Sequence, residues 1–162
     1  PKATRTEPLL EEPPQQEAEK PEPLPVPEVE QEEPEEFADA DLQEQFRREV
    51  ERNLKTIYFA YDSYSLSDSA KEKIVTAIAF LEKHPDLKIV LEGHCDERGS
   101  SEYNMGLGFN RANTVKSYMR TYGASTGRIE TTSWGKERPA EAYCQSDACH
   151  ALNRRVEFKV IR

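Results

Sequence analysis

The sequence predicts an α/β fold, an α+β sandwich in which helices cover one face of a mixed four-stranded sheet, with a disordered tail in front of it. Segments with helical periodicity alternate with short β-rich segments from residue 56 onward, which is typical of such a layered domain. Nine of the eleven prolines lie in residues 1–40, whereas all seven glycines lie between Gly93 and Gly135. The 162 residues are enough for one ordinary domain and a tail.

Residues 1–40 are predicted to be an acidic, proline-rich linker. They hold 13 acidic and 3 basic side chains, whereas the whole chain has a net charge of −9, so the remainder is close to neutral. With few large apolar residues, this segment cannot offset the entropy of ordering, and we expect it to be disordered. Fully extended at about 3.1 Å per residue, it would reach roughly 100 Å. It is either a tether between an anchor and a target or a solubilising tail.

The next two predicted elements are an amphipathic helix over residues 41–55 and a buried strand over residues 56–61. Apolar residues recur every fourth position of the helix, at Leu42, Phe46, Val50 and Leu54. Asp41 and Glu44 have the spacing of a capping box at its start. The strand is predicted from a β-rich run of residues.

Two helix–strand units follow. A helix over residues 68–83 is expected to end at His84, because the residue before a proline avoids the helical region. A strand over residues 87–91 then leads into the polar segment Glu92–Gly99. A second helix over residues 101–122 ends before Gly123, where a left-handed cap favours glycine. Further strands are expected over residues 128–133 and 154–161, with a loop between them.

Three cysteines are present, and two of them lie close together in a polar segment. We expect Cys144 and Cys149 to close a small disulfide loop, which suits an oxidising compartment. Two free thiols are the main alternative. A metal site that adds His150 and a fourth ligand such as His94 or Cys95 is a third.

Several functions are disfavoured by the sequence. No run of 18 apolar residues occurs, so we expect no membrane-spanning helix. No secretory signal is visible, and we expect a mature or trimmed chain whose targeting segment has been removed. A near-neutral domain with an acidic tail is poorly suited to nucleic acid. No nucleotide-binding glycine loop or zinc-protease helix occurs, so we expect no enzyme and no cofactor.

Four blocks of sequence, in order over residues 56–162, carry a family resemblance. The first is Tyr58-Phe59-Ala60-Tyr61-Asp62, and the second runs from Gly93-His94-Cys95-Asp96-Glu97-Arg98-Gly99 through Glu102-Tyr103-Asn104 and Leu107-Gly108 to Arg111-Ala112. The others are Ser133-Trp134-Gly135-Lys136-Glu137-Arg138-Pro139 and Asn153-Arg154-Arg155-Val156. Together they resemble the OmpA-like family of peptidoglycan-binding domains, and the Asp-Glu-Arg-Gly form of the second block favours its peptidoglycan-associated lipoprotein branch.

The resemblance implies a βαβαββ-type domain that binds the diaminopimelate of the peptidoglycan stem peptide. That residue ends in an ammonium and a carboxylate, so Asp96 would accept from the ammonium and Arg111 would grip the carboxylate bidentately. The remaining candidates are neighbours of this pair: Asp62, Tyr61, Gly99, Arg98, Ser100, Leu107 and Asn104.

Each assignment has a structural alternative. Asp96 and Arg111 could form an ion pair without a ligand, and Asp62 could serve only as a turn residue. Tyr61 and Leu107 could belong to the core, and Asn104 could brace the second helix. His94 is expected to be a hydrogen-bonded histidine on its strand rather than a metal ligand.

The same resemblance implies a cellular role. A lipid anchor in the outer membrane would hold the N-terminus, the tail would cross the periplasm, and the domain would bind the wall, with Tol-system proteins as partners. The alternatives are an OmpA-type or flagellar-stator-type domain of another assembly, or a protein-interaction module. An enzyme using Cys95 with His94 or His150 is disfavoured, since adjacent residues on a strand point to opposite faces.

Overall fold

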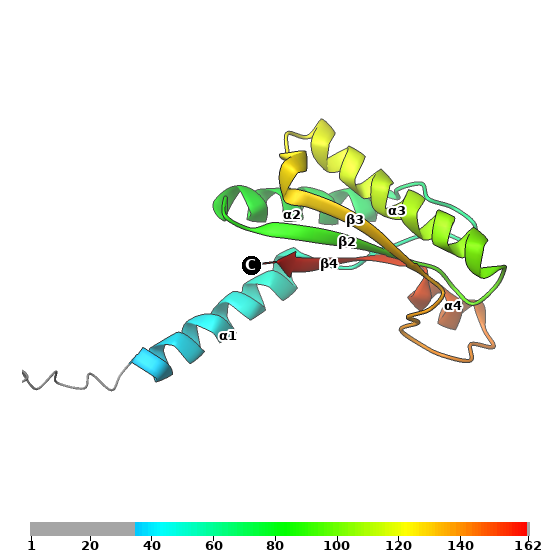
Figure 1. Ribbon diagram of the computed structural model, residues 1–162, viewed down its shortest axis with the longest axis horizontal. Coiled ribbons are helices and arrows are strands. Elements are labelled where there is room, and N and C mark those ends of the chain that lie inside the picture. The colour runs from blue at the N-terminus through cyan, green and yellow to red at the C-terminus, as the bar shows by residue number, and fades with distance from the viewer. Residues whose placement is uncertain (1–34, 162) are drawn as a thin grey trace, which may run out of the picture. The chain divides into compact units, whose positions relative to one another are not determined.

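The computed structural model describes residues 35–161, and helices alternate with strands within that range (Figure 1). The linker expected over residues 1–40 lies almost entirely outside the described residues and stays a prediction. In chain order the elements are α1 (Glu35–Asn53), β1 (Ile57–Tyr58), α2 (Asp68–Lys83), β2 (Lys88–His94), α3 (Ser101–Thr121), a 3₁₀ turn (Thr126–Arg128), β3 (Ile129–Gly135), α4 (Asp147–Asn153) and β4 (Arg155–Ile161).

The four strands form one mixed sheet in the order β1-β4-β2-β3. Strands β2 and β3 are parallel, and β4 runs antiparallel to both β1 and β2. A parallel pair needs a long crossover, which α3 provides between β2 and β3. Helices α2 and α3 lie on the same face of the sheet (Figure 1). The predicted α+β arrangement, with helices on one face of a four-stranded mixed sheet, is therefore confirmed.

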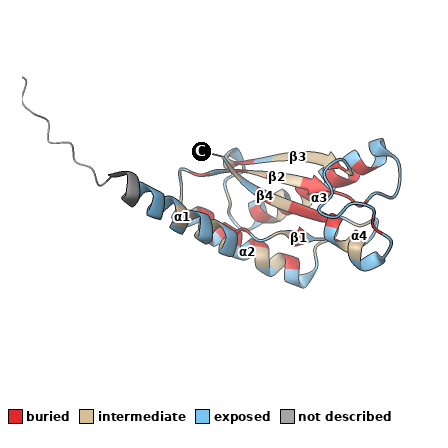
Figure 2. Ribbon diagram, turned by 90° about the horizontal axis from the view of Figure 1, so that it is seen from below, coloured by how far each residue is buried: buried red, intermediate tan, exposed pale blue. Residues whose placement is uncertain are grey.

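Alternation along the strands separates an apolar face from a polar one. Ile89 and Leu91 of β2 and Val156 of β4 are fully buried in the core, against Ile74 of α2 and Val115 of α3. Figure 2 shows such buried residues along the strands and helices. Burying each of these side chains contributes about 1.5–3 kcal/mol to stability. The opposite face of β2 and β4 carries charged residues, as the alternation requires.

Helix α1 begins earlier than predicted. It starts at Glu35, so Asp41 lies inside the helix and the predicted capping box is wrong. Glutamate and alanine are good helix formers, and they allow the helix to extend upstream of Asp41. Toward its other end the helix packs on the domain, where the ring of Phe46 lies 6.3 Å from Phe80 and 5.7 Å from His84.

Two further elements differ from prediction because tertiary contacts decide them. Strand β1 has only two residues, which pair with Val156 and Arg155 at the start of β4. One further backbone hydrogen bond, from the Phe59 amide to the Arg154 carbonyl, follows before the chain turns away. Helix α4 lies where a loop was expected, and it is too short to show helical periodicity in the sequence. Ser146 caps α4 by accepting a hydrogen bond from the Cys149 amide.

Helix α3 crosses the end of β2 at a glycine pair. A Cβ atom on Gly93 would lie 1.8 Å from the carbonyl oxygen of Gly108, and one on Gly108 would lie 2.4 Å from Ser133 Oγ. Only glycine allows helix and strand backbones to approach this closely. The contact holds α3 beside the polar segment that follows β2.

Candidate functional site

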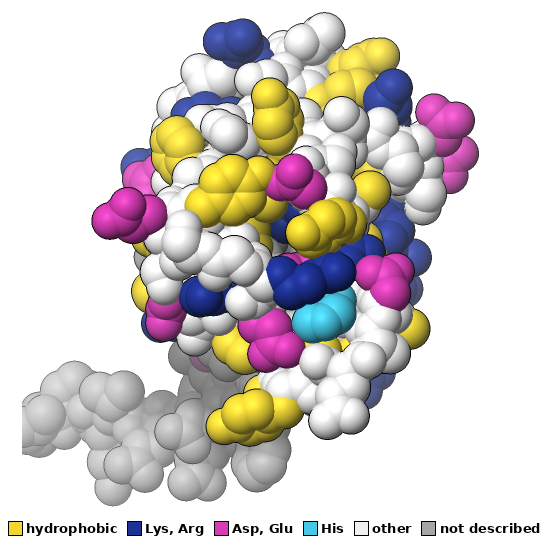
Figure 3. Space-filling model, turned by 90° about the vertical axis from the view of Figure 1, so that its right-hand side faces the viewer, with side chains coloured by type: hydrophobic (Ala, Val, Ile, Leu, Met, Phe, Trp, Pro, Cys, Tyr) yellow, Lys and Arg dark blue, Asp and Glu magenta, His cyan; other side chains and the backbone are white. Residues whose placement is uncertain are grey.

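A pocket of about 150 Å³ opens where β2 ends and α3 begins. Figure 3 views the domain from this end and shows hydrophobic side chains among basic and acidic ones. Eight of the nine residues predicted for the ligand line the pocket, which is formed by Tyr61, Asp62, Cys95, Asp96, Arg98, Gly99, Tyr103, Asn104, Leu107 and Arg111. The ninth, Ser100, does not line it and instead caps α3 by accepting a hydrogen bond from the Tyr103 amide.

Asp96 lies directly after β2 and is held by arginines. It is 4% exposed, and its Oδ2 accepts from Arg98 Nη2 at 2.8 Å and lies 3.6 Å from Arg154 Nη1. Its Oδ1 accepts from the Arg98 amide at 3.1 Å. Burial raises the pKa of Asp96, but the side-chain and backbone hydrogen bonds from Arg98 outweigh it and leave the pKa below its usual value. Asp96 is therefore a charged acceptor at neutral pH.

Arg111 is fully buried, and backbone carbonyls hold its guanidinium. Nε donates to Ser63 O at 2.8 Å, Nη1 to His94 O at 2.9 Å and Nη2 to Ala60 O at 3.2 Å. Nη1 also contacts Cys95 Sγ at 3.5 Å. Burial lowers the pKa of Arg111, although an arginine stays charged in proteins. Arg111 thus ties the segment after β1 to the end of β2.

The ion pair considered between Asp96 and Arg111 is not formed. Within residues 39–161, the ion pairs of Asp96 are with Arg98 and Arg154. Asp96 and Arg111 nevertheless line the same pocket, one as an acceptor and the other as a buried positive charge.

The turn after β1 contributes Tyr61 and Asp62 to the pocket lining. Asp62 has a left-handed backbone with φ of 49°, and its carboxylate accepts a hydrogen bond from the Tyr103 hydroxyl. That hydrogen bond raises the pKa of Tyr103. The ring of Tyr61 is exposed, so it does not belong to the core, and the Arg98 guanidinium lies 4.1 Å from its centre. Sequence reasoning missed Tyr103 as a pocket residue, although its place one helical turn before Leu107 was a usable signal.

The floor of the pocket is structural. Asn104 is buried and donates to Arg98 O at 2.9 Å, which holds the loop that contains Gly99 in its left-handed conformation. Cys95 is the free cysteine of the described residues, and it donates to Asn104 O. Burial raises the pKa of Cys95 to about 11, so the thiol is protonated at neutral pH and is a poor nucleophile.

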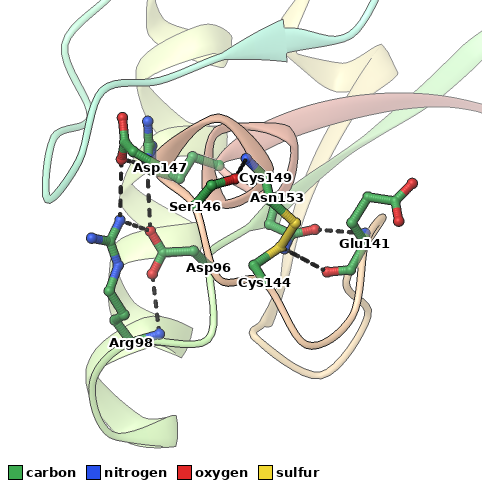
Figure 4. The surroundings of a disulfide bond; sticks show 9 residues. Asp96, Arg98, Glu141, Cys144, Ser146, Asp147, Cys149 and Asn153 are labelled. Atoms are coloured by element: carbon green, nitrogen blue, oxygen red, sulfur yellow. Dashed lines mark hydrogen bonds and ion pairs between the residues drawn. A yellow bond between two sulfur atoms is a disulfide. The ribbon is translucent and has the colours of Figure 1, made fainter.

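A disulfide loop near the C-terminus lies beside Asp96 and Arg98 (Figure 4). Cys144 and Cys149 are bonded, with Cα atoms 5.4 Å apart, so neither thiolate is available to a metal. Asp147 lies between them and pairs with Arg154 Nη1 at 3.3 Å and Arg98 Nη2 at 3.8 Å. The loop therefore supplies a second carboxylate to the arginines that hold Asp96.

Comparison with known proteins identifies the family. Residues 58–152 match the OmpA family. The chain is 40% identical over 122 residues to the peptidoglycan-associated lipoprotein of Legionella pneumophila, a match that covers 75% of this chain and 68% of that protein. It is 44% identical over 108 residues to the peptidoglycan-associated lipoprotein of Pseudomonas aeruginosa, which covers 67% of this chain and 63% of that protein.

Solved structures of related domains share this fold. The crystal structure of the peptidoglycan-associated lipoprotein from Burkholderia pseudomallei has a TM-score of 0.63 and 36% identity, over 66% of this chain and 90% of that one. The C-terminal domain of Helicobacter pylori MotB has a TM-score of 0.62 over 67% of this chain and 85% of that one, and its 21% identity shows the shared fold alone. No helix among residues 35–161 is both long and apolar enough to cross a bilayer. The chain belongs to the OmpA family, and it is similar within that family to the peptidoglycan-associated lipoproteins named above.

Proposed function

We propose that this domain binds peptidoglycan non-covalently by taking the diaminopimelate end of a stem peptide into the pocket beside Asp96 and Arg111. The observation that carries the proposal is this pocket, which a buried carboxylate and a buried guanidinium line together. The names of the relatives support the coarser part of the proposal, an association with peptidoglycan.

The two charged ends of the ligand would meet different groups. The ammonium would approach Asp96, whose two oxygens retain lone pairs beyond those used by Arg98. The carboxylate would approach Arg111. A guanidinium has five N–H groups. Hydrogen bonds to three carbonyls and the contact with the thiol use four of them, and the remaining Nη2 proton has no partner among the described residues. A single charge-assisted bond therefore replaces the bidentate grip expected from the sequence.

The remaining pocket residues would shape the site. Leu107 offers an apolar contact to the methylene stem, and Gly99 leaves space for close approach of the ligand backbone. Tyr61 and Asp62 would complete the lining from the turn after β1. Arg98 bridges Asp96 and the Tyr61 ring, so its side chain would be a rim contact held between them.

A site of this size should bind one stem peptide weakly, with Kd from micromolar to millimolar, or about −4 to −8 kcal/mol. The wall repeats the ligand many times, so many anchored copies would hold it by avidity. We propose a periplasmic domain tethered through its N-terminal linker to a lipid anchor in the outer membrane. The Tol-system proteins are proposed as its protein partners.

Co-sedimentation with purified diaminopimelate-type peptidoglycan sacculi tests the proposal. Asp96→Asn keeps the shape of the side chain while removing its charge, so it should reduce the bound fraction at least tenfold. The matched control is Asp86→Asn, an exposed carboxylate in the turn after α2. If Asp96→Asn and the wild type bind equally, and circular dichroism shows that both are folded, the pocket does not recognise the wall.

A further inference from the structure

Three metal-ligating side chains converge on the sheet face opposite α2 and α3. Glu92 and His94 lie two residues apart on β2, so they point to the same face. Glu157 of β4 lies in register with Glu92. Their donor atoms all lie within 4.8 Å of one another. None of the three lines the pocket beside Asp96.

His94 has no hydrogen-bond partner for either ring nitrogen among the described residues. The residue is 1% exposed, and both Nδ1 and Nε2 are buried. Nε2 lies 3.7 Å from a Glu157 oxygen and 3.8 Å from a Glu92 oxygen, too far for a hydrogen bond. The expectation of a hydrogen-bonded histidine is therefore wrong, because no acceptor or donor from the packed strands reaches the ring. A buried polar group left unpartnered in this way costs about 1–3 kcal/mol.

The spacing fits a tetrahedral cation. Two ligands at about 2.0–2.2 Å from a Zn²⁺ ion lie roughly 3.4 Å apart at the tetrahedral angle, close to the separations measured here. Small rotations of the two glutamates would complete the geometry. We propose that Glu92, His94 and Glu157 form a binding site for a divalent transition-metal cation of the zinc type, with a fourth position open to solvent.

The electrostatics of the site favour a metal over a proton. Burial, followed by the charge of Arg155, lowers the pKa of His94 to about 4, so the imidazole is neutral at pH 7 and keeps a lone pair for a metal. Arg155 Nε donates to one oxygen of Glu157 at 2.9 Å and thereby orients the other toward His94.

Lys159 is the competing cation. Its Nζ lies 3.5 Å from the Glu157 oxygen that faces His94, and its side chain is 55% exposed. It can therefore move into solvent when a metal binds, and removing its charge should strengthen binding. Substitution of Lys159 and substitution of the glutamates should therefore change metal affinity in opposite directions.

Calorimetric titration of the metal-free, disulfide-intact chain with Zn²⁺ tests the site, and thermal unfolding provides a second readout. We expect saturable one-to-one binding at micromolar Zn²⁺ and a rise in Tm. Glu92→Gln and Glu157→Gln should each weaken binding at least tenfold, whereas Lys159→Gln should tighten it severalfold. Glu130→Gln is the matched control, an exposed carboxylate on the same face of β3 that should leave binding unchanged.

Cobalt(II) adds a geometric readout, since tetrahedral coordination produces strong visible absorption that octahedral coordination lacks. That absorption should appear in the wild type and disappear in Glu157→Gln. The proposal is overturned if no saturable binding occurs at millimolar Zn²⁺. It is equally overturned if Glu92→Gln and Glu157→Gln bind as the wild type does, which would assign the metal to His84 or His150.

Discussion

A buried guanidinium needs an acceptor for each desolvated N–H group, and Arg111 finds three of them in backbone carbonyls of two segments, the turn after β1 and the end of β2. The same bonds satisfy Ala60, Ser63 and His94 carbonyls near the pocket. Arg111 is therefore a structural residue as well as a proposed ligand contact. Its removal affects the fold first.

Replacing Arg111 with methionine should reduce the free energy of unfolding by about 3 kcal/mol or more, since several buried carbonyls lose their donor. Urea denaturation measures this change. Arg120→Met on the exposed side of the same helix is the control, and it should shift stability by less than about 0.5 kcal/mol. Equal stability of the two variants would contradict the anchoring role.

The histidine on the opposite face makes stability depend on pH. The pKa of His94 is about 4 in the folded chain and about 6.5 when unfolded, so its contribution is complete above pH 6.5 and is lost as the pH falls toward 4. Over that window the loss should reach about 3 kcal/mol. The measurement is urea denaturation in EDTA from pH 7 to pH 4, in which His94→Gln should show a flatter profile than the wild type. Parallel profiles for His94→Gln and the wild type would disprove the shift.

The sequence motifs identified which residues meet, but not how they pair. The family resemblance predicted that Asp96, Arg111 and most of their neighbours lie around one pocket, and they do. It did not reveal that Arg98 and Arg154 hold Asp96, or that Ser100 serves as a cap. The arginine pairings depend on rotamers and on the approach of α4, which no local pattern records. The cap at Ser100 did have a local signal, a serine directly before the helix.

At the scale of elements, the crossing of α3 over β2 depends on two glycines. Gly93→Ala should reduce the free energy of unfolding by more than about 3 kcal/mol, because the new Cβ meets the Gly108 carbonyl of the facing backbone. Gly106→Ala on α3, the helix that crosses Gly93, is the control. It has open space around it and should stabilise by about 0.5–1 kcal/mol through helix propensity. Thermal and urea unfolding distinguish them, and similar effects of both would argue against the close crossing.

The disulfide loop is the second element with a measurable contribution. Replacing Cys144 and Cys149 with serine should cost about 2 kcal/mol, the loop entropy of so short a closure. Since Asp147 pairs with Arg154 and Arg98, the same double variant should also weaken sacculus binding. Urea unfolding with and without reductant gives the stability, and co-sedimentation gives the binding. An unaltered midpoint under reducing conditions would show that the bridge adds nothing.

Local signals predicted the long elements well. Helix α2 has a serine cap and a proline stop, and α3 ends before a glycine with φ of 93°, so their boundaries agree closely with the sequence. Strand β1 and helix α4 could not be predicted in this way. The length of β1 depends on its pairing with the start of β4, and α4 depends on a disulfide and a cap within a short segment.

At the scale of the whole molecule, the two faces of the sheet have different roles. One face packs against α2 and α3 and forms the core, while the loop at the end of β2 carries Asp96 into the pocket. The opposite face holds the proposed metal cluster. In the proposed function, each pocket binds weakly, and many anchored copies together hold the wall by avidity. The linker would set how far each copy can reach from its anchor.

The most direct test of wall recognition is an NMR titration of the full chain with a diaminopimelate stem peptide and with a peptide that carries lysine instead. The lysine peptide keeps the ammonium but lacks the second carboxylate. The account predicts saturable shifts around Asp96 and Arg111 with the first peptide and much weaker ones with the second. Identical shifts with both peptides, or none at millimolar concentration, would contradict it.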